Sequence, residues 1–221
     1  MSFDFGPVLD RWQFLAFGLW TTVYVSGLAI ALGFSLGLLL GLLRTYGGRF
    51  TGLAIGFYVD TMRSVPVLVI LVWTYFALPL VLGMAWSPAT AAIVGFGVHL
   101  SAYVAEVIRA GLLSIRPGQY RAGLTLGMSA FQTVRTIVLP QAAIRMVPPL
   151  GSLAVITVKD SSIAAVIAAP ELMRQSQIIA QWTFRPFEVY TATMIVYFLM
   201  CYPLARGIDR LYRRLAPRGA S

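Results

Sequence analysis

The amino-acid sequence predicts an all-α integral membrane protein with five transmembrane helices. Of its 221 residues, 58% are hydrophobic and only 11% are charged, and the mean hydropathy is +0.79. A soluble domain carries roughly a quarter charged residues. The apolar residues also gather in runs of about 20, the length that a helix needs to cross a bilayer. Both observations place the chain in a membrane.

The expected spans form one transmembrane domain, residues 1–221. Asp4 and Asp10 precede the first apolar run, where a secretory signal peptide would have basic residues, and the run itself is too long for a signal peptide. We therefore expect the first span to remain in the protein. The five spans are expected at about 17–43, 57–83, 87–113, 146–169 and 188–206.

The formal net charge of +9 follows a pattern along the chain. Arginine gathers on alternate connections between the spans, as the positive-inside rule describes for cytoplasmic loops. This predicts an N-terminus outside and a C-terminus in the cytoplasm, with the basic surface facing anionic lipid and not nucleic acid. The arginines on these connections are Arg44, Arg49, Arg109, Arg116, Arg121, Arg135, Arg145, Arg206, Arg210, Arg213, Arg214 and Arg218.

The connection between the third and fourth spans, about 115–144, is by far the longest on the predicted cytoplasmic side. Pro117 and Gly118 break the preceding helix. Gly127 would cost about 1 kcal/mol inside a helix, and Pro140 is expected to end the element. The pattern allows two interpretations, an amphipathic helix on the membrane surface or a helix that docks onto a cytoplasmic partner.

This connection resembles the cytoplasmic signature of ABC importer permeases, E-A-A-x3-G-x9-I-x-L-P. Two positions depart from it, since Arg121 stands where the family has Glu and Gly123 where it has Ala. The resemblance extends over about 15–210 and is closest to the polar amino acid branch, whose substrates include histidine, glutamine, arginine and opines. The stretches that carry it are TMRSVPVLVILVWTYFALPL, SAYVAEVIRAGLLSIRPGQY, LPQAAIRMVPPLGSLAVITVKDSSIAAVI and TFRPFEVY.

The resemblance implies a type I ABC importer transmembrane fold in the bacterial cytoplasmic membrane. It further implies a second permease subunit, the same or homologous, a cytoplasmic ATPase dimer and an external solute-binding protein. The permease would move polar amino acids by alternating access, and its coupling helix would fit a groove on the ATPase. The coupling residues that the resemblance implies are Arg121, Ala122, Gly123, Gly127, Ile137, Leu139 and Pro140.

The sequence independently supports the placement of ATP hydrolysis on a partner chain. It contains no G-x-x-x-x-G-K-[ST] pattern, and its only lysine is Lys159, so these residues cannot build a P-loop. We therefore expect no catalytic activity and no bound cofactor, with ATP and Mg on the partner ATPase. An ion-coupled secondary amino acid carrier is the alternative, although its paired discontinuous helices are not evident. An enzyme would need a cluster of nucleophile, base or metal ligands.

The fourth span is interrupted by Lys159, Asp160, Ser161 and Ser162. Charged groups at membrane depth are costly and usually face a bundle interior or an aqueous cavity. Since an amino acid needs countercharges, Asp160 and the serines are candidates for lining the substrate path, together with Lys159, Arg63 and Glu106. The alternative is a salt bridge from this span to Arg63 or Glu106 that only holds the bundle together.

Three further features are interpreted as structural. Glu106 and Arg109 form an i, i+3 pair that can be satisfied locally. Gly33, Gly37 and Gly41 recur every four residues and predict a close helix–helix contact. His99 has no second His or Cys at ligand spacing, so a hydrogen-bonded histidine is expected there and no metal site.

Overall fold

The computed structural model describes residues 4–216, and these residues are almost entirely helical. The α-helices are α1 (Gly6–Leu9), α2 (Trp12–Tyr46), α3 (Arg49–Ser64), α4 (Val67–Phe76), α5 (Leu78–Leu82), α6 (Pro88–Leu113), α7 (Pro117–Thr125), α8 (Ala130–Thr133), α9 (Leu139–Asp160), α10 (Leu172–Thr183) and α11 (Pro186–Leu215). A π-helical stretch, Val134–Val138, joins α8 to α9, and a 3₁₀ stretch, Ser161–Ile167, extends α9. Arg218 lies outside the described residues.

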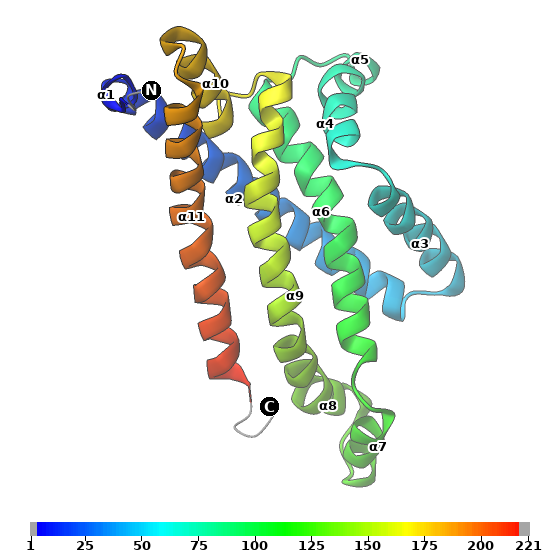
Figure 1. Cartoon of the computed structure of the whole chain (residues 1–221). Coiled ribbons are helices and arrows are strands. Elements are labelled where there is room, and N and C mark those ends of the chain that lie inside the picture. Colours follow the sequence, from blue (N-terminus) through cyan, green and yellow to red (C-terminus); the bar gives the residue numbers. More distant parts are fainter. Residues whose placement is uncertain (1–3, 217–221) are drawn as a thin grey trace.

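The long helices α6, α9 and α11 run alongside one another, and α2 crosses them obliquely (Figure 1). Helices α1, α5 and α10 lie at one end of the bundle, which we call the α10 end (Figure 1). Helices α7 and α8 lie at the opposite end, called the α7 end (Figure 1). The long connection therefore protrudes from one end of the bundle (Figure 1).

The described chain contains four helices that are long and apolar enough to cross a membrane, and a bent pair of helices that makes a fifth if its two pieces form one span. The four are the continuous stretches Trp12–Tyr46, Pro88–Leu113, Ala130–Ile167 and Pro186–Leu215. The fifth consists of two pieces, Arg49–Ser64 and Val67–Leu82, which meet at an angle of 102°. The second span, expected as one run over about 57–83, thus begins earlier and is broken.

The break in the second span lies at the end of α3 and has a local cause. Pro66 cannot donate a backbone hydrogen bond, and the residue before a proline is forced out of helical conformation. Val65 accordingly adopts an extended conformation, with φ −93° and ψ 132°. Helix α4 then starts directly after Pro66. The chain therefore exposes a helix C-terminus and a helix N-terminus within the span.

Helix α2 packs against α6 along its small residues, which confirms the predicted glycine contact. Leu100, Val104 and Ile108 of α6 fill the space beside Gly33, Gly37 and Gly41, respectively. Larger residues of α2 point outward instead, among them Leu38, Leu39 and Trp20. Small residues thus lie inside and large apolar residues outside, the reverse of a soluble protein. This arrangement suits a membrane, where lipid covers apolar side chains and close approach of the backbones holds helices together.

Candidate functional site

The long connection at the α7 end folds into two short helices joined by a turn. Helix α7 ends at Thr125, and Gly127 follows it with φ +78°, a left-handed conformation that favours glycine. Ser129 then caps α8 through a reciprocal pair of hydrogen bonds with Gln132. The predicted cost of Gly127 inside a helix does not arise, because the residue forms the turn.

Gly123 holds this connection together at its centre. A side-chain carbon added there would lie 2.6 Å from Thr133 Cγ2 and 3.1 Å from Ile137 Cδ1. The backbone of α7 therefore packs directly on the last residue of α8 and on the π-helical stretch. Alanine, the residue that the family signature has at this position, would force α7 away from Thr133. The glycine at position 123, where the family signature has alanine, therefore allows an unusually close contact between α7 and Thr133.

Pro140 corrects one sequence expectation. The proline was expected to end the element, but it lies in the first turn of α9. The chain nevertheless stays helical through this proline, because the wider π-helical turn Val134–Val138 precedes it and runs directly into α9. Leu139 and Pro140 are both exposed and mark where the connection enters the fourth span.

The outer surface of the connection is apolar and basic. Leu126 and Phe131 are 80% and 72% exposed, and Arg121 and Ala122 are exposed beside them on α7. Exposed apolar side chains flanked by charge are typical of a protein contact surface. The structure thus brings Gly123 and Ile137 together inside the connection and leaves Arg121, Ala122 and Gly127 on its surface.

A cavity of about 150 Å³ lies between α6, α9 and the break in the second span. Asp160 of α9 and Val67, the first residue of α4, both line it. The remaining lining residues are Phe96, His99, Leu100, Tyr103, Leu153, Ile156 and Thr157. The cavity therefore combines one carboxylate, a helix N-terminus and several neutral polar groups within a mostly apolar wall.

Asp160 forms no ion pair with any described lysine or arginine. The salt bridge from Asp160 to Arg63, the alternative that the sequence allows, is thus not seen among the described residues. Lys159 and Ser162 face a different space, a groove of about 470 Å³ between α9 and α11. Ser161 is fully buried and donates its hydroxyl to the Val158 carbonyl. Only Asp160 of these four residues lines the cavity.

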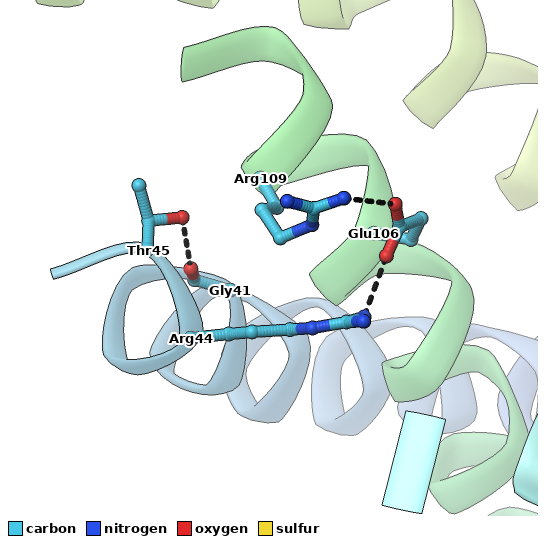
Figure 2. A network of polar contacts seen from close by, with 5 residues as sticks. All are labelled: Gly41, Arg44, Thr45, Glu106 and Arg109. Carbon is cyan, nitrogen blue, oxygen red and sulfur yellow. Dashed lines mark hydrogen bonds and ion pairs between the residues drawn. The ribbon is translucent and has the colours of Figure 1, made fainter. Parts of the chain in front are cut away.

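Arg63 and Glu106 lie outside the cavity lining. The Arg63 guanidinium lies over the Tyr103 ring, 5.5 Å from its centroid. The Glu106 carboxylate forms salt bridges with Arg44 at 2.6 Å and with Arg109 at 3.3 Å, one through each of its oxygens (Figure 2). Figure 2 shows this cluster joining α2 to α6. The local pairing of Glu106 with Arg109 is thus confirmed, and Arg44 is an added partner.

The sequence does not single out two of the cavity residues, Tyr103 and Thr157, and it predicts His99 only as a hydrogen-bonded histidine. His99 and Tyr103 lie one turn apart on α6 and were embedded in an apolar run. The signal that could have found them is the Val65–Pro66 dipeptide, which breaks the second span opposite these side chains. Thr157 is one turn from Asp160 on α9 and belongs to the same face.

Comparison with known proteins agrees with this architecture. Residues 33–220 match the family described as binding-protein-dependent transport system inner membrane component. The glutamine transport system permease protein of Escherichia coli (strain K12) is 37% identical over 97% of this chain and 99% of its own. The L-cystine transport system permease protein of Bacillus subtilis (strain 168) is 31% identical over 92% and 87%, respectively.

Solved structures show the same fold. The crystal structure of an amino acid ABC transporter with histidines matches with a TM-score of 0.89 and 32% identity, over 97% of this chain and 100% of that chain. An inward-facing structure of the MetNI methionine ABC transporter matches with a TM-score of 0.77 and 24% identity, over 94% and 99%. The chain belongs to the binding-protein-dependent transport system inner membrane components, the multi-pass permeases of type I ABC importers.

Proposed function

We propose that this chain is the permease subunit that moves polar amino acids into the cell by alternating access. It receives substrate from an extracytoplasmic solute-binding protein and pairs with a second permease subunit, the same or homologous. A separate ATPase dimer binds ATP and Mg and docks at the α7 end, while this chain binds no cofactor and performs no catalysis. The α10 end, with the N-terminus, faces outside, and the C-terminus lies in the cytoplasm.

The observation that carries this proposal is the cavity beside Asp160. An amino acid carries an ammonium and a carboxylate, and the unpaired Asp160 carboxylate offers a partner for the ammonium. The first amides of α4 have no partner inside their helix, and the positive end of the helix dipole favours an anion there. Val67 brings this helix end to the cavity wall. The two ends of a zwitterion are thus matched.

Two further observations support the proposal. The relatives named for glutamine and for cystine both carry amino acids in their names, which favours this class of substrate for the family branch. The exposed Leu126 and Phe131 supply an apolar contact surface for an ATPase groove. Arg121 adds positive charge to that surface where the family signature has negative charge.

The broken second span also keeps one alternative open, an ion-coupled amino acid carrier. Discontinuous helices with a substrate site near the break are typical of secondary carriers. The carrier and the ABC permease share the use of Asp160 and differ in the source of energy, which a transport assay distinguishes.

Asp160→Asn tests the proposed use of the cavity. The substitution removes the charge but little volume, so we expect amino acid uptake to fall at least about tenfold, as the loss of a charge-assisted bond implies. Membrane level and complex assembly should stay normal. Asp60→Asn, an exposed position on α3, is the matched control. Uptake unchanged by Asp160→Asn would contradict the role, and loss of the assembled complex would indicate a structural role instead.

A further inference from the structure

The long connection at the α7 end carries positive charge and no negative charge (Figure 1). No aspartate or glutamate occurs between Glu106 and Asp160. Arg116, Arg121 and Arg135 are exposed on the connection. Their side chains form no hydrogen bond, ion pair or ring contact within residues 4–216. The connection therefore presents three unpaired guanidinium groups to its surroundings.

The arginines of α2, α6 and α9 are, by contrast, paired within the chain. Arg44 and Arg109 form salt bridges with Glu106. Arg145 donates to the Ser114 carbonyl at the C-terminal end of α6, at 2.6 Å. These side chains hold the helices of the bundle together, whereas the three arginines of the connection contribute no contact to the fold.

Arg121 projects from the outward side of α7. Successive residues of a helix are about 100° apart, so Arg121 lies nearly opposite Gly123, the residue that packs on Thr133. The exposed Ala122 and Leu124 lie on either side of Arg121. A helix that lies on a membrane separates its basic face from its apolar face, whereas α7 mixes the two kinds of side chain on one face. Arginine among apolar side chains is typical of a protein interface.

The N-terminal end of α7 adds to the positive potential of the connection. Arg116 occupies the N-cap position and forms no side-chain cap, and the first turn contains no acidic residue. The positive end of the helix dipole is therefore not compensated by a neighbouring carboxylate of this chain.

We propose that the ATPase receives this connection in a recess lined with carboxylates, one of which pairs with Arg121. Docking removes water from the guanidinium groups, and a buried charge without a partner is costly. The connection has no carboxylate of its own, so the ATPase must supply the negative charge. An ATPase whose recess is basic, as suits a permease with Glu at this position, is rejected because like charges in contact oppose binding.

This inference rests on the proposed function, because it assumes that an ATPase docks at the α7 end. It adds the chemistry of the partner surface and a physical reason for the arginine at position 121. Arg121 acts at the interface as a residue that determines which ATPase the chain accepts.

The chain suits a chemical test, because its only lysine, Lys159, lies within a span. A carbodiimide joins an amine to a carboxylate in direct contact with it, and Arg121→Lys places an amine on the connection while keeping the charge. We expect carbodiimide treatment of the full-length chain, bound to its ATPase, to link this amine to an aspartate or glutamate of the ATPase, identified by mass spectrometry. Arg210→Lys, at an exposed position of α11, is the matched control and should form no such link.

The affinity for the ATPase measures the contribution of the charge. We expect Arg121→Glu to weaken binding at least about tenfold in nanodiscs of neutral lipid, since a repulsion replaces an attraction. The difference from the wild type should shrink at high salt. Arg210→Glu changes the net charge equally and should weaken binding less than about twofold.

Two results overturn the acidic recess and leave the proposed function standing. One is an assembled complex in which Arg121→Lys forms no link. The other is an affinity that Arg121→Glu leaves unchanged in neutral lipid, and an effect confined to nanodiscs of anionic lipid would show that the arginines meet the membrane surface instead. If the wild-type chain binds no ATPase, both the inference and the proposed function fall.

Discussion

Glu171 is the one fully buried carboxyl group of the described chain, and it lies just before α10, outside the spans. Its oxygens accept the amides of Met173 and Arg174 and the hydroxyl of Tyr197. Burial raises the pKa of Glu171 to about 7, and the three donors offset this only in part. Glu171 thereby caps α10 and ties it to α11.

The raised pKa of Glu171 predicts a pH dependence of stability. The folded state holds the proton more tightly than the unfolded state, so the contribution is complete below pH 4.5 and is lost as pH rises to about 7. A shift of this size corresponds to about 3 kcal/mol. We expect the melting temperature to fall by several degrees between pH 5 and pH 7.5, measured on the purified protein.

Glu171→Gln should remove that dependence, because the amide keeps the shape and does not titrate. Asp60→Asn, at an exposed carboxyl, should leave the slope as in the wild type. An equal slope in Glu171→Gln and wild type would show that another group causes the pH effect.

At the same scale, the sequence predicted which residue types matter better than it predicted where they lie. Asp160 was a candidate because a carboxylate within a span is costly, and it does line a cavity. Glu106 was a candidate on the same grounds, but it is neutralised by Arg44, a residue 62 positions away. Pairing between distant helices depends on their packing, which a pattern within one helix does not contain.

At the scale of elements, the contact between α2 and α6 depends on the close approach of their two backbones. A side-chain carbon at Gly37 would lie 2.7 Å from the Ser101 carbonyl oxygen, so the two helices would have to separate. Gly27 lies on the exposed side of α2, with nothing within 4 Å of an added carbon. The two glycines therefore serve as a matched pair in one helix.

We expect Gly37→Ala to destabilise the protein by about 1–3 kcal/mol, the usual cost of overpacking. Gly27→Ala should be neutral, or stabilising by up to about 1 kcal/mol, because alanine favours the helix. Thermal unfolding of both variants in the same detergent measures the difference. Equal melting temperatures would show that the α2–α6 contact adjusts without cost.

The elements themselves were partly predictable. Apolar runs identified the four continuous spans and the region of the bent pair, since length and hydropathy suffice for that. The break in the second span was missed, because the run over about 57–83 is apolar on both sides of Val65 and Pro66 and was read as one helix. The sequence indicates that Gly127 would be unfavourable inside a helix, but it does not predict the turn that Gly127 forms. Two separate helices and one interrupted helix can have the same composition, so composition does not distinguish them.

At the scale of the whole molecule, the bundle interior and the α7 end have different proposed tasks. The cavity with Asp160 and His99 lies between the helices of the bundle, and the exposed surface of Leu126 and Phe131 lies at the α7 end. Helix α9 joins the two regions, since it begins at the connection and ends at Asp160. Displacement of the connection by an ATPase would therefore act on the cavity wall directly through one helix.

The central claim, that a partner ATPase drives transport through this chain, is tested most directly in proteoliposomes holding the chain, its ATPase and its binding protein. We predict amino acid uptake that requires ATP hydrolysis and continues after ionophores collapse all ion gradients. Uptake that an ionophore abolishes while ATP remains high would contradict the account and establish an ion-coupled carrier.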